Sequence, residues 1–175
     1  MQLINKKICM GKDIGIHGNM FGGILMAWID EAAASFATEY CYTPNMVTLK
    51  VGELRFKKPI KVGNHIRLYG EVAHLGTTSI TLEIEVRKYN PYSGVETVVC
   101  TTSITFVRID DDGNPTPIGE SVKKKYGELL LAAVYGKELS FYLPEQILHV
   151  QQLCTGSYCG DADTQHAVQV HILPR

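Results

Sequence analysis

The hydrophobic residues of this chain change their spacing about a quarter of the way along it. From Phe21 to about Tyr40, apolar side chains occupy nearly every position, with many Ala and no Pro. Such a segment is typical of a helix that is buried on most of its faces. Gly22 and Gly23 mark the predicted start, and Pro44 predicts the end because proline disfavours a helical residue before it.

After this proline, apolar and polar residues alternate, which is typical of half-buried strands. The alternation runs through residues 66–72, 79–87 and 98–106. Turn-forming residues at 76–77 and 90–94 separate these segments, so consecutive strands are predicted to pair as antiparallel hairpins. The sequence therefore predicts three long strands that belong to one sheet.

Between residues 46 and 56 the apolar positions move from one phase of the alternation to the other. A slip of this kind predicts a β-bulge, which we place near Gly52 and Glu53. Residues 2–10 are a further expected strand. One strand, one apolar helix and four strands predict an α+β protein. Its curved antiparallel sheet wraps around one long central helix, which is the hotdog fold.

The chain changes character at Asp110–Pro115, a sequence typical of a turn or a domain boundary. We predict a hotdog domain over residues 1–118 and a C-terminal extension over 119–175, with a helix at 121–142 and an irregular tail. No metal site is predicted, because the spacing of the tail's histidines and cysteines matches no zinc finger. These residues are His149, Cys154, Cys159, His166 and His171.

Composition excludes several classes of function. The chain has 175 residues, with 17 Lys+Arg against 18 Asp+Glu and a net charge of −1. That charge supplies no overall field for nucleic acid or an anionic membrane. No apolar stretch reaches the ~18 residues of a transmembrane helix, and Lys6 and Lys7 interrupt the apolar run that a signal peptide needs. We expect a cytoplasmic protein with no nucleic-acid or membrane partner, and with buried, reduced cysteines.

Asp30 is the most unusual residue of the predicted helix, because apolar residues and alanines flank it. A carboxylate buried among such residues is unfavourable unless it is paired or hydrogen-bonded. Burial also raises the pKa of a carboxyl group, which suits a general base. The structural alternative is a short polar stripe that Asp30 forms with Glu31 at the helix surface.

The start of the helix is a second candidate for chemistry. First-turn amides lack intrahelical partners and carry the positive end of the helix dipole, and Gly22 and Gly23 leave them uncovered. They suit a carbonyl oxygen, as in an oxyanion hole; the alternative is a tight turn capped by Asn19. Gly23 and Asp30 lie about 10 Å apart on a helix. If both act on one carbonyl, two subunits must share the site, which predicts a two-fold dimer.

Basic residues gather around Pro59 and on the neighbouring predicted strands. They are Arg55, Lys57, Lys58, Lys61, Arg67, Arg87 and Lys88. Charged residues at a sheet edge are usually a solvated surface, but these also suit a phosphorylated carrier. The turn at residues 74–79 adds backbone amides and hydroxyl groups that suit phosphate oxygens.

Four motifs carry a family resemblance. They are GNMFGGILMAWIDEAAA, VTLKVGELRFKKPIKVGN, HLGTTSITLEIEV and TTSITFVRIDDDGNPTPI, in this order. Over about residues 1–118 the chain resembles the hotdog-fold acyl-CoA thioesterases of the acyl-CoA hydrolase family. The resemblance implies hydrolysis of acyl-CoA to a free carboxylic acid and CoA, without metal or bound cofactor. It also implies a tight homodimer and trimers of such dimers.

The resemblance implies roles for individual residues. Asp30 matches the helix carboxylate that acts as general base or nucleophile, and Asn19 matches a polar residue that works opposite it from another hotdog. Gly22 and Gly23 match the helix start, where an amide polarises the thioester carbonyl. Thr48 matches a position near the acyl end of the site.

The same comparison assigns a region to the CoA phosphates and adenosine. Its residues are Arg55, Lys57, Gly76, Thr77, Thr78 and Ser79. Two features depart from the family: Gly15 stands where many relatives have Asn, and the residues after about 127 match nothing typical of it.

Two other functions fit the same fold. A non-catalytic acyl-CoA or lipid binder would bind CoA esters without turnover. A hotdog dehydratase needs a histidine and a carboxylate in one site, and only His17 lies near the predicted helix start.

Overall fold

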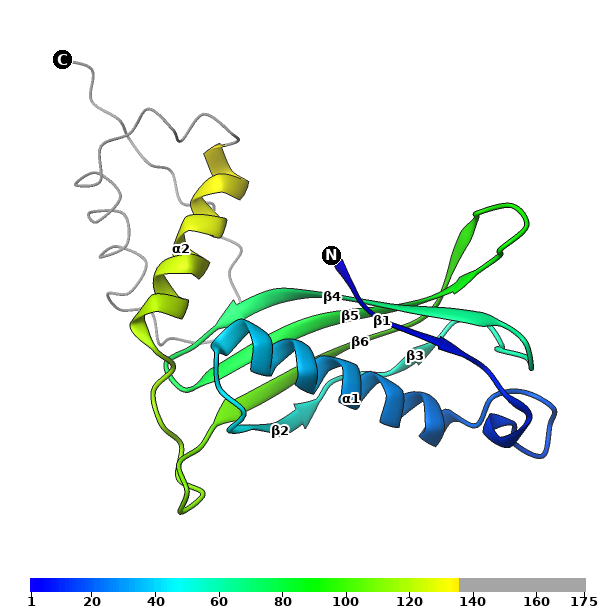
Figure 1. Ribbon diagram of the computed structural model, residues 1–175, viewed down its shortest axis with the longest axis horizontal. Coiled ribbons are helices and arrows are strands. Elements are labelled where there is room, and N and C mark those ends of the chain that lie inside the picture. The colour runs from blue at the N-terminus through cyan, green and yellow to red at the C-terminus, as the bar shows by residue number, and fades with distance from the viewer. Residues whose placement is uncertain (136–175) are drawn as a thin grey trace. The chain divides into compact units, whose positions relative to one another are not determined.

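The computed structural model describes residues 1–135, in which one long helix lies against an antiparallel sheet (Figure 1). The strands are β1 (Gln2–Ile8), β2 (Met46–Val51), β3 (Arg55–Phe56), β4 (His65–Leu75), β5 (Ser79–Tyr89) and β6 (Glu96–Arg108). The helices are α1 (Gly22–Cys41) and α2 (Glu120–Tyr135), and a 3-10 turn spans Gly11–Asp13. This arrangement confirms the predicted α+β architecture.

The sheet has the strand order β1-β4-β5-β6-β2, and β3 pairs with β6 beyond the end of β2. All neighbouring strands are antiparallel. The three strands with the clearest alternation, β4, β5 and β6, form the centre and pair as consecutive hairpins, as predicted. The strand that follows the helix, β2, therefore lies at the edge of the sheet.

One face of α1 packs on the sheet, and this contact forms the core. Its buried residues recur at helical spacing, and they are Leu25, Ile29, Ala32, Ala33, Phe36, Ala37, Tyr40 and Cys41. The opposite face is exposed in the single chain, where Met26 keeps 45% of its surface and Gly23, Ala27 and Glu31 are also exposed. The prediction that the helix is buried on most faces is therefore wrong for one chain alone.

A break at residues 52–54 separates β2 from β3, and the predicted bulge lies there. Four residue steps from Val51 to Arg55 lie opposite three steps from Ile104 to Thr101 of β6, so one residue is extra. Gly52 lies close to β6, because a Cβ there would meet Oγ of Ser103 and its amide donates to the Ser103 carbonyl at 2.8 Å. A further register shift between β2 and β6 occurs between Thr48 and Lys50.

The helix predicted at 121–142 is described from Glu120 to Tyr135, and the rest of that range lies outside the described residues. Lys125 places its ammonium group 4.7 Å from the centre of the Tyr40 ring, and Tyr126 donates to the Ala73 carbonyl at 3.2 Å. Internal contacts divide the chain into Met1–Leu129 and Leu130–Arg175. The predicted domain boundary at residue 118 stays a prediction. Among the described helices, none is long and apolar enough to cross a membrane.

Three of the five cysteines lie in the described part of the chain. Cys9, Cys41 and Cys100 are free and buried, which confirms the prediction of buried reduced thiols for these three. Burial raises the pKa of Cys41 and of Cys100 to about 11. Cys154 and Cys159 lie outside the described residues.

Candidate active site

Asp30 and Thr48 are brought together by the packing of α1 beside β2. The hydroxyl of Thr48 donates a hydrogen bond to Oδ1 of Asp30 at 2.8 Å. Asp30 is half-buried in the single chain. The neighbouring Glu31 turns the other way and forms an ion pair with Lys7 of β1 at 2.9 Å. The two acids therefore contact opposite edge strands and do not form one polar stripe.

A pocket of about 280 Å³ opens beside this pair. Apart from Asp30 and Thr48 its lining is apolar, and consists of Met26, Ala27, Ile29, Val51, Leu54 and Ile104. The break at residues 52–54 shapes the pocket, because it ends β2 at Val51 and leaves Leu54 in the lining. A pocket with one carboxylate and apolar walls suits an acyl chain whose reactive carbonyl lies at the polar end.

The start of α1 leaves two amide groups without a backbone acceptor. The amides of Ile24 and Leu25 donate to the Phe21 carbonyl, whereas those of Gly22 and Gly23 make no backbone hydrogen bond in the described chain. Aromatic rings crowd both glycines. A Cβ on Gly23 would lie 2.7 Å from the Phe21 ring, and one on Gly22 would lie 3.3 Å from the Phe56 ring.

The loop before α1 holds Asn19 close to this helix start. The Gly15 amide donates to the Asn19 carbonyl at 2.8 Å, and the Met20 amide donates to the Ile60 carbonyl at 2.8 Å. The side-chain oxygen of Asn19 is buried and has no hydrogen-bond partner in the described chain. Such an orphan acceptor is unusual in a folded protein and is typical of functional sites.

The sequence did not identify Asp13, which holds the loop before α1 in place. Its side chain is only 4% exposed, and its Oδ2 accepts the Met10 amide at 2.8 Å. Its carbonyl accepts the Phe21 amide, also at 2.8 Å. The residues around Asp13 give no periodic signal, so only the buried contacts reveal that this residue positions the helix start.

The basic residues divide into paired and unpaired groups. Arg55 forms an ion pair with Glu53 at 2.6 Å, and the hydrogen bond from Arg55 lowers the pKa of Glu53. Arg67 and Arg87 both bind the Glu96 carboxylate, at 2.6 and 3.0 Å. Because Glu96 holds both arginines and Glu85 also pairs with Arg87, these two arginines are not free to hold the phosphates of a carrier. Lys57 takes part in no ion pair of the described chain.

The two regions predicted to contact CoA lie far apart along β6. Ser79 lies opposite Val107 of β6, and Arg55 lies opposite Thr101 of the same strand, which separates them by about 20 Å along a strand. In the turn, the carbonyls of Thr77 and Thr78 accept the amides of Ile118 and Arg108. The Gly76 amide donates to the Ser79 carbonyl. One chain does not bring these two regions together.

Metal ligands do not gather in the described chain. Within residues 1–135, no three side chains of His, Cys, Asp or Glu are placed to hold a metal ion. The histidines and cysteines of the predicted tail, from His149 to His171, lie outside the described residues.

Comparisons with known proteins agree on one family. The sequence model of the thioesterase superfamily matches residues 17–95. The acyl-CoA thioester hydrolase YciA of Salmonella typhimurium is 31% identical over 120 residues, which are 67% of this chain and 90% of that protein. This chain belongs to the acyl-CoA thioester hydrolases. The uncharacterized acyl-CoA thioester hydrolase YkhA of Bacillus subtilis is also 31% identical, over 68% of this chain and 69% of the relative.

Solved structures place this thioesterase in the hotdog fold. A hexameric hotdog-fold thioesterase of Campylobacter jejuni is 32% identical with a TM-score of 0.63, covering 73% of this chain and 97% of that one. A hexameric broad-specificity acyl-coenzyme A thioesterase reaches a TM-score of 0.69 at 28% identity, over 76% and 98% of the two chains. An acyl-CoA hydrolase from Staphylococcus aureus, solved with butyryl coenzyme A, is 26% identical with a TM-score of 0.62, over 86% and 93%.

Proposed function

We propose that this thioesterase hydrolyses acyl-CoA at a site that two subunits share, with Asp30 of one subunit opposite the helix start of the other. The observation that carries the proposal is the hydrogen bond between Thr48 and Asp30 at the mouth of an apolar pocket. Asp30 and Gly23 lie about 10 Å apart on one helix. A second copy therefore has to supply the group that binds the carbonyl oxygen.

The exposed surface of the single chain supports such a dimer. The edge strand β2 exposes Val47, Leu49 and Val51, with 42%, 67% and 40% of their surfaces uncovered. An apolar edge strand with free backbone groups is a template for pairing with another chain. A two-fold antiparallel pairing of β2 would also bring the exposed face of each α1 into the interface. The hexameric relatives are consistent with trimers of this dimer.

The proposed reaction adds water across the thioester bond. The Asp30 carboxylate takes a proton as the water oxygen attacks the thioester carbon, and the Gly23 amide binds the oxygen that becomes negative. Asn19 orients the water or the carboxylate. The carbon–sulfur bond then breaks, CoA leaves as a thiolate that takes up the proton, and the fatty acid is released. In the nucleophilic variant Asp30 attacks the thioester carbon directly and the carbon–sulfur bond breaks, so that CoA leaves as the thiolate. Water then hydrolyses the resulting anhydride to the carboxylic acid and regenerates Asp30. Neither route uses a metal or a bound cofactor.

A screen of acyl-CoA chain lengths with a thiol reagent tests this function. The expected result is release of one CoA thiol per carboxylic acid formed, with a preference that falls once the chain outgrows the pocket. Binding of CoA esters without thiol release would instead indicate a non-catalytic binder. Hydration of an enoyl-CoA without thiol release would indicate a dehydratase, although the hydrogen-bond partner of Asp30 is a threonine and not a histidine.

Thr48 is expected to position Asp30, and its removal should slow catalysis. Thr48→Val keeps the shape but removes the hydroxyl, so we expect kcat to fall about tenfold, because a hydrogen bond to a charged group contributes ~1.5–3 kcal/mol. Thr48→Ser keeps the donor and should retain most of the activity. Steady-state kinetics measure both variants, with size-exclusion chromatography to confirm their assembly. Full activity of Thr48→Val would contradict the positioning role.

A further inference from the structure

The ring of Phe56 lies against the start of α1, on the helix face that lines the pocket beside Asp30. A Cβ on Gly22 would lie 3.3 Å from Cζ of this ring. Gly22, Met26 and Asp30 recur every four residues and therefore share one face of α1, and the last two line the pocket. No role proposed above uses Phe56. We propose that its ring ends the pocket and limits the length of acyl chain that the enzyme accepts, an inference that rests on the proposed hydrolysis.

Strand pairing turns the Phe56 side chain toward α1. Phe56 lies directly opposite Cys100 of β6, and residues that are opposite each other in a sheet point to the same face. Cys100 is fully buried in the core that the sheet forms with α1, so Phe56 points to the helix side of the sheet as well. The backbone beside the ring is fixed, because the Lys57 amide donates to the Val99 carbonyl at 2.8 Å.

Two contacts between α1 and the neighbouring edge of the sheet mark the ends of the pocket. At one end Thr48 donates its hydrogen bond to Asp30, and at the other the Phe56 ring covers Gly22. The chain therefore runs from Thr48 to Phe56 in the direction opposite to α1. Figure 1 shows the same order, with β2 beside the later turns of the helix and β3 nearer its start.

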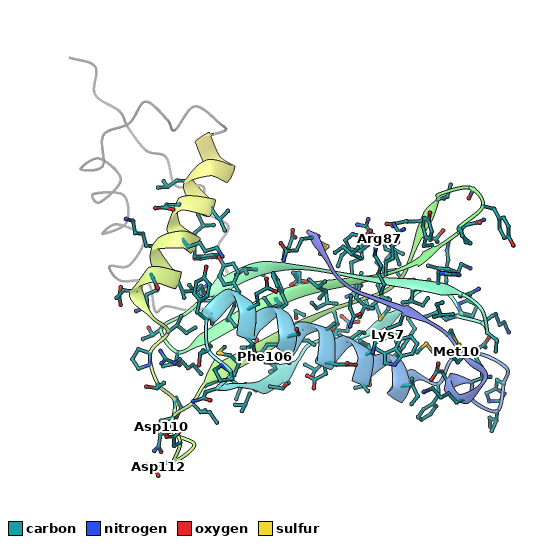
Figure 2. The ribbon with its side chains drawn as sticks, viewed as in Figure 1. Lys7, Met10, Arg87, Phe106, Asp110 and Asp112 are labelled. Carbon is teal, nitrogen blue, oxygen red and sulfur yellow. The ribbon has the colours of Figure 1, made fainter. Side chains whose placement is uncertain are left out.

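The wall between these two contacts is apolar. Val51 and Leu54 lie between the contacts along the chain, and both line the pocket. Ile104 of β6, which lies opposite Val51, lines it from the sheet. Phe106, two positions further along β6, is fully buried beside α1 (Figure 2). The pocket therefore offers an alkyl chain apolar contacts from the carboxylate to the aromatic ring.

The spacing of the two contacts along α1 gives the length of chain that fits. Gly22 and Asp30 lie eight positions apart, which is about 12 Å at ~1.5 Å per residue. A fully extended peptide advances at most ~3.6 Å per residue, or roughly 1.2 Å for each of its three backbone bonds, and an alkyl chain is built from similar bonds. An acyl chain of roughly eight to ten carbons therefore reaches from Asp30 to the Phe56 ring.

Phe56→Ala is expected to shift the preference of the enzyme toward longer chains. Each methylene group that enters an apolar pocket strengthens binding about fourfold, so kcat/KM of the wild type should rise with chain length and level off at roughly eight to ten carbons. Without the ring, at least two more methylene groups fit. The ratio of kcat/KM for dodecanoyl-CoA to that for butyryl-CoA should therefore rise by about tenfold or more. Thiol release measures both substrates.

Two further variants make the test specific. Tyr92→Ala is the matched control, because it removes another exposed ring, from the hairpin between β5 and β6, and it should keep the wild-type ratio. Phe56→Leu shortens the side chain but keeps an apolar contact, so its ratio should rise less than that of Phe56→Ala. A ratio of two substrates cancels any general loss of activity, and Phe56 is 56% exposed, so its loss removes little of the core.

The inference is overturned if Phe56→Ala and Phe56→Leu both keep the wild-type ratio, or if kcat/KM of the wild type rises without levelling off as far as palmitoyl-CoA. Failure of the proposed hydrolysis gives a different result, because then no acyl-CoA releases thiol. Calorimetry with the same acyl-CoAs then measures the ratio of their dissociation constants in the wild type and in Phe56→Ala, which decides whether the ring limits the chain.

Discussion

Asp30→Asn is expected to lower kcat for acyl-CoA hydrolysis by about 10²–10⁴-fold, the usual contribution of a general base. The amide cannot take a proton from water, and it is a much weaker nucleophile than the carboxylate. The substitution changes little else, because the side-chain oxygen of Asn can still accept the hydrogen bond that Thr48 donates to Asp30. Thiol release under saturating acyl-CoA measures the effect.

The matched control is Glu31→Gln, which removes the adjacent carboxylate of the same helix. Glu31 is exposed and pairs with Lys7, so its loss should leave kcat unchanged and have little effect on stability, as is usual for surface ion pairs. Substrate binding to Asp30→Asn should persist, which calorimetry can check with a slowly turned-over acyl-CoA. Full hydrolysis by Asp30→Asn would show that another group activates the water.

The positions of α1 and of the central strands could be predicted because they follow from local periodicity. Apolar residues at nearly every position of one segment and at alternate positions of β4, β5 and β6 indicate a helix and a sheet without knowledge of their contacts. Asp30 was recognisable for the same reason, as a charged residue in an apolar helix. These signals lie within single elements.

The contacts of the site could not be predicted, because they depend on how distant elements pair. The bond from Thr48 to Asp30 requires the edge position of β2 beside α1. Ion pairs likewise decide which basic side chains remain free to bind phosphate. Arg55 pairs with Glu53, and Arg67 pairs with Glu96. The sequence shows only that the charges exist.

The burial predicted for α1 is greater than its burial in the single chain, and the difference is informative. The composition of the helix suits burial on most faces, yet Met26 and Ala27 are exposed, as are Val47 and Leu49 on the neighbouring β2. Exposed apolar residues that adjoin one another mark an interaction surface. The difference between the predicted and the observed burial of α1 therefore indicates the surface that a second copy covers.

The shared site makes a prediction that no single variant can test. Gly23→Pro removes the amide hydrogen at the helix start, and proline is tolerated in a first turn because that hydrogen has no intrahelical partner. Gly23→Ala is the control, since it keeps the amide and adds a Cβ that meets the Phe21 ring, a side chain exposed enough to move. We expect Gly23→Pro to lose about 10²–10³-fold in kcat, as for an oxyanion-hole donor, and Gly23→Ala to lose far less.

Two inactive variants should then restore each other. In a mixed dimer of Asp30→Asn and Gly23→Pro chains, one site carries both defects. The other joins the intact Gly23 of the first chain to the intact Asp30 of the second. Co-expression in equal amounts should therefore recover roughly a quarter of wild-type activity, since about half of randomly paired dimers are mixed and each has one intact site. If each site lay within one chain, every site in the mixture would keep a defect and activity would stay near zero. Thiol release from the co-purified chains thus decides whether catalysis requires two subunits.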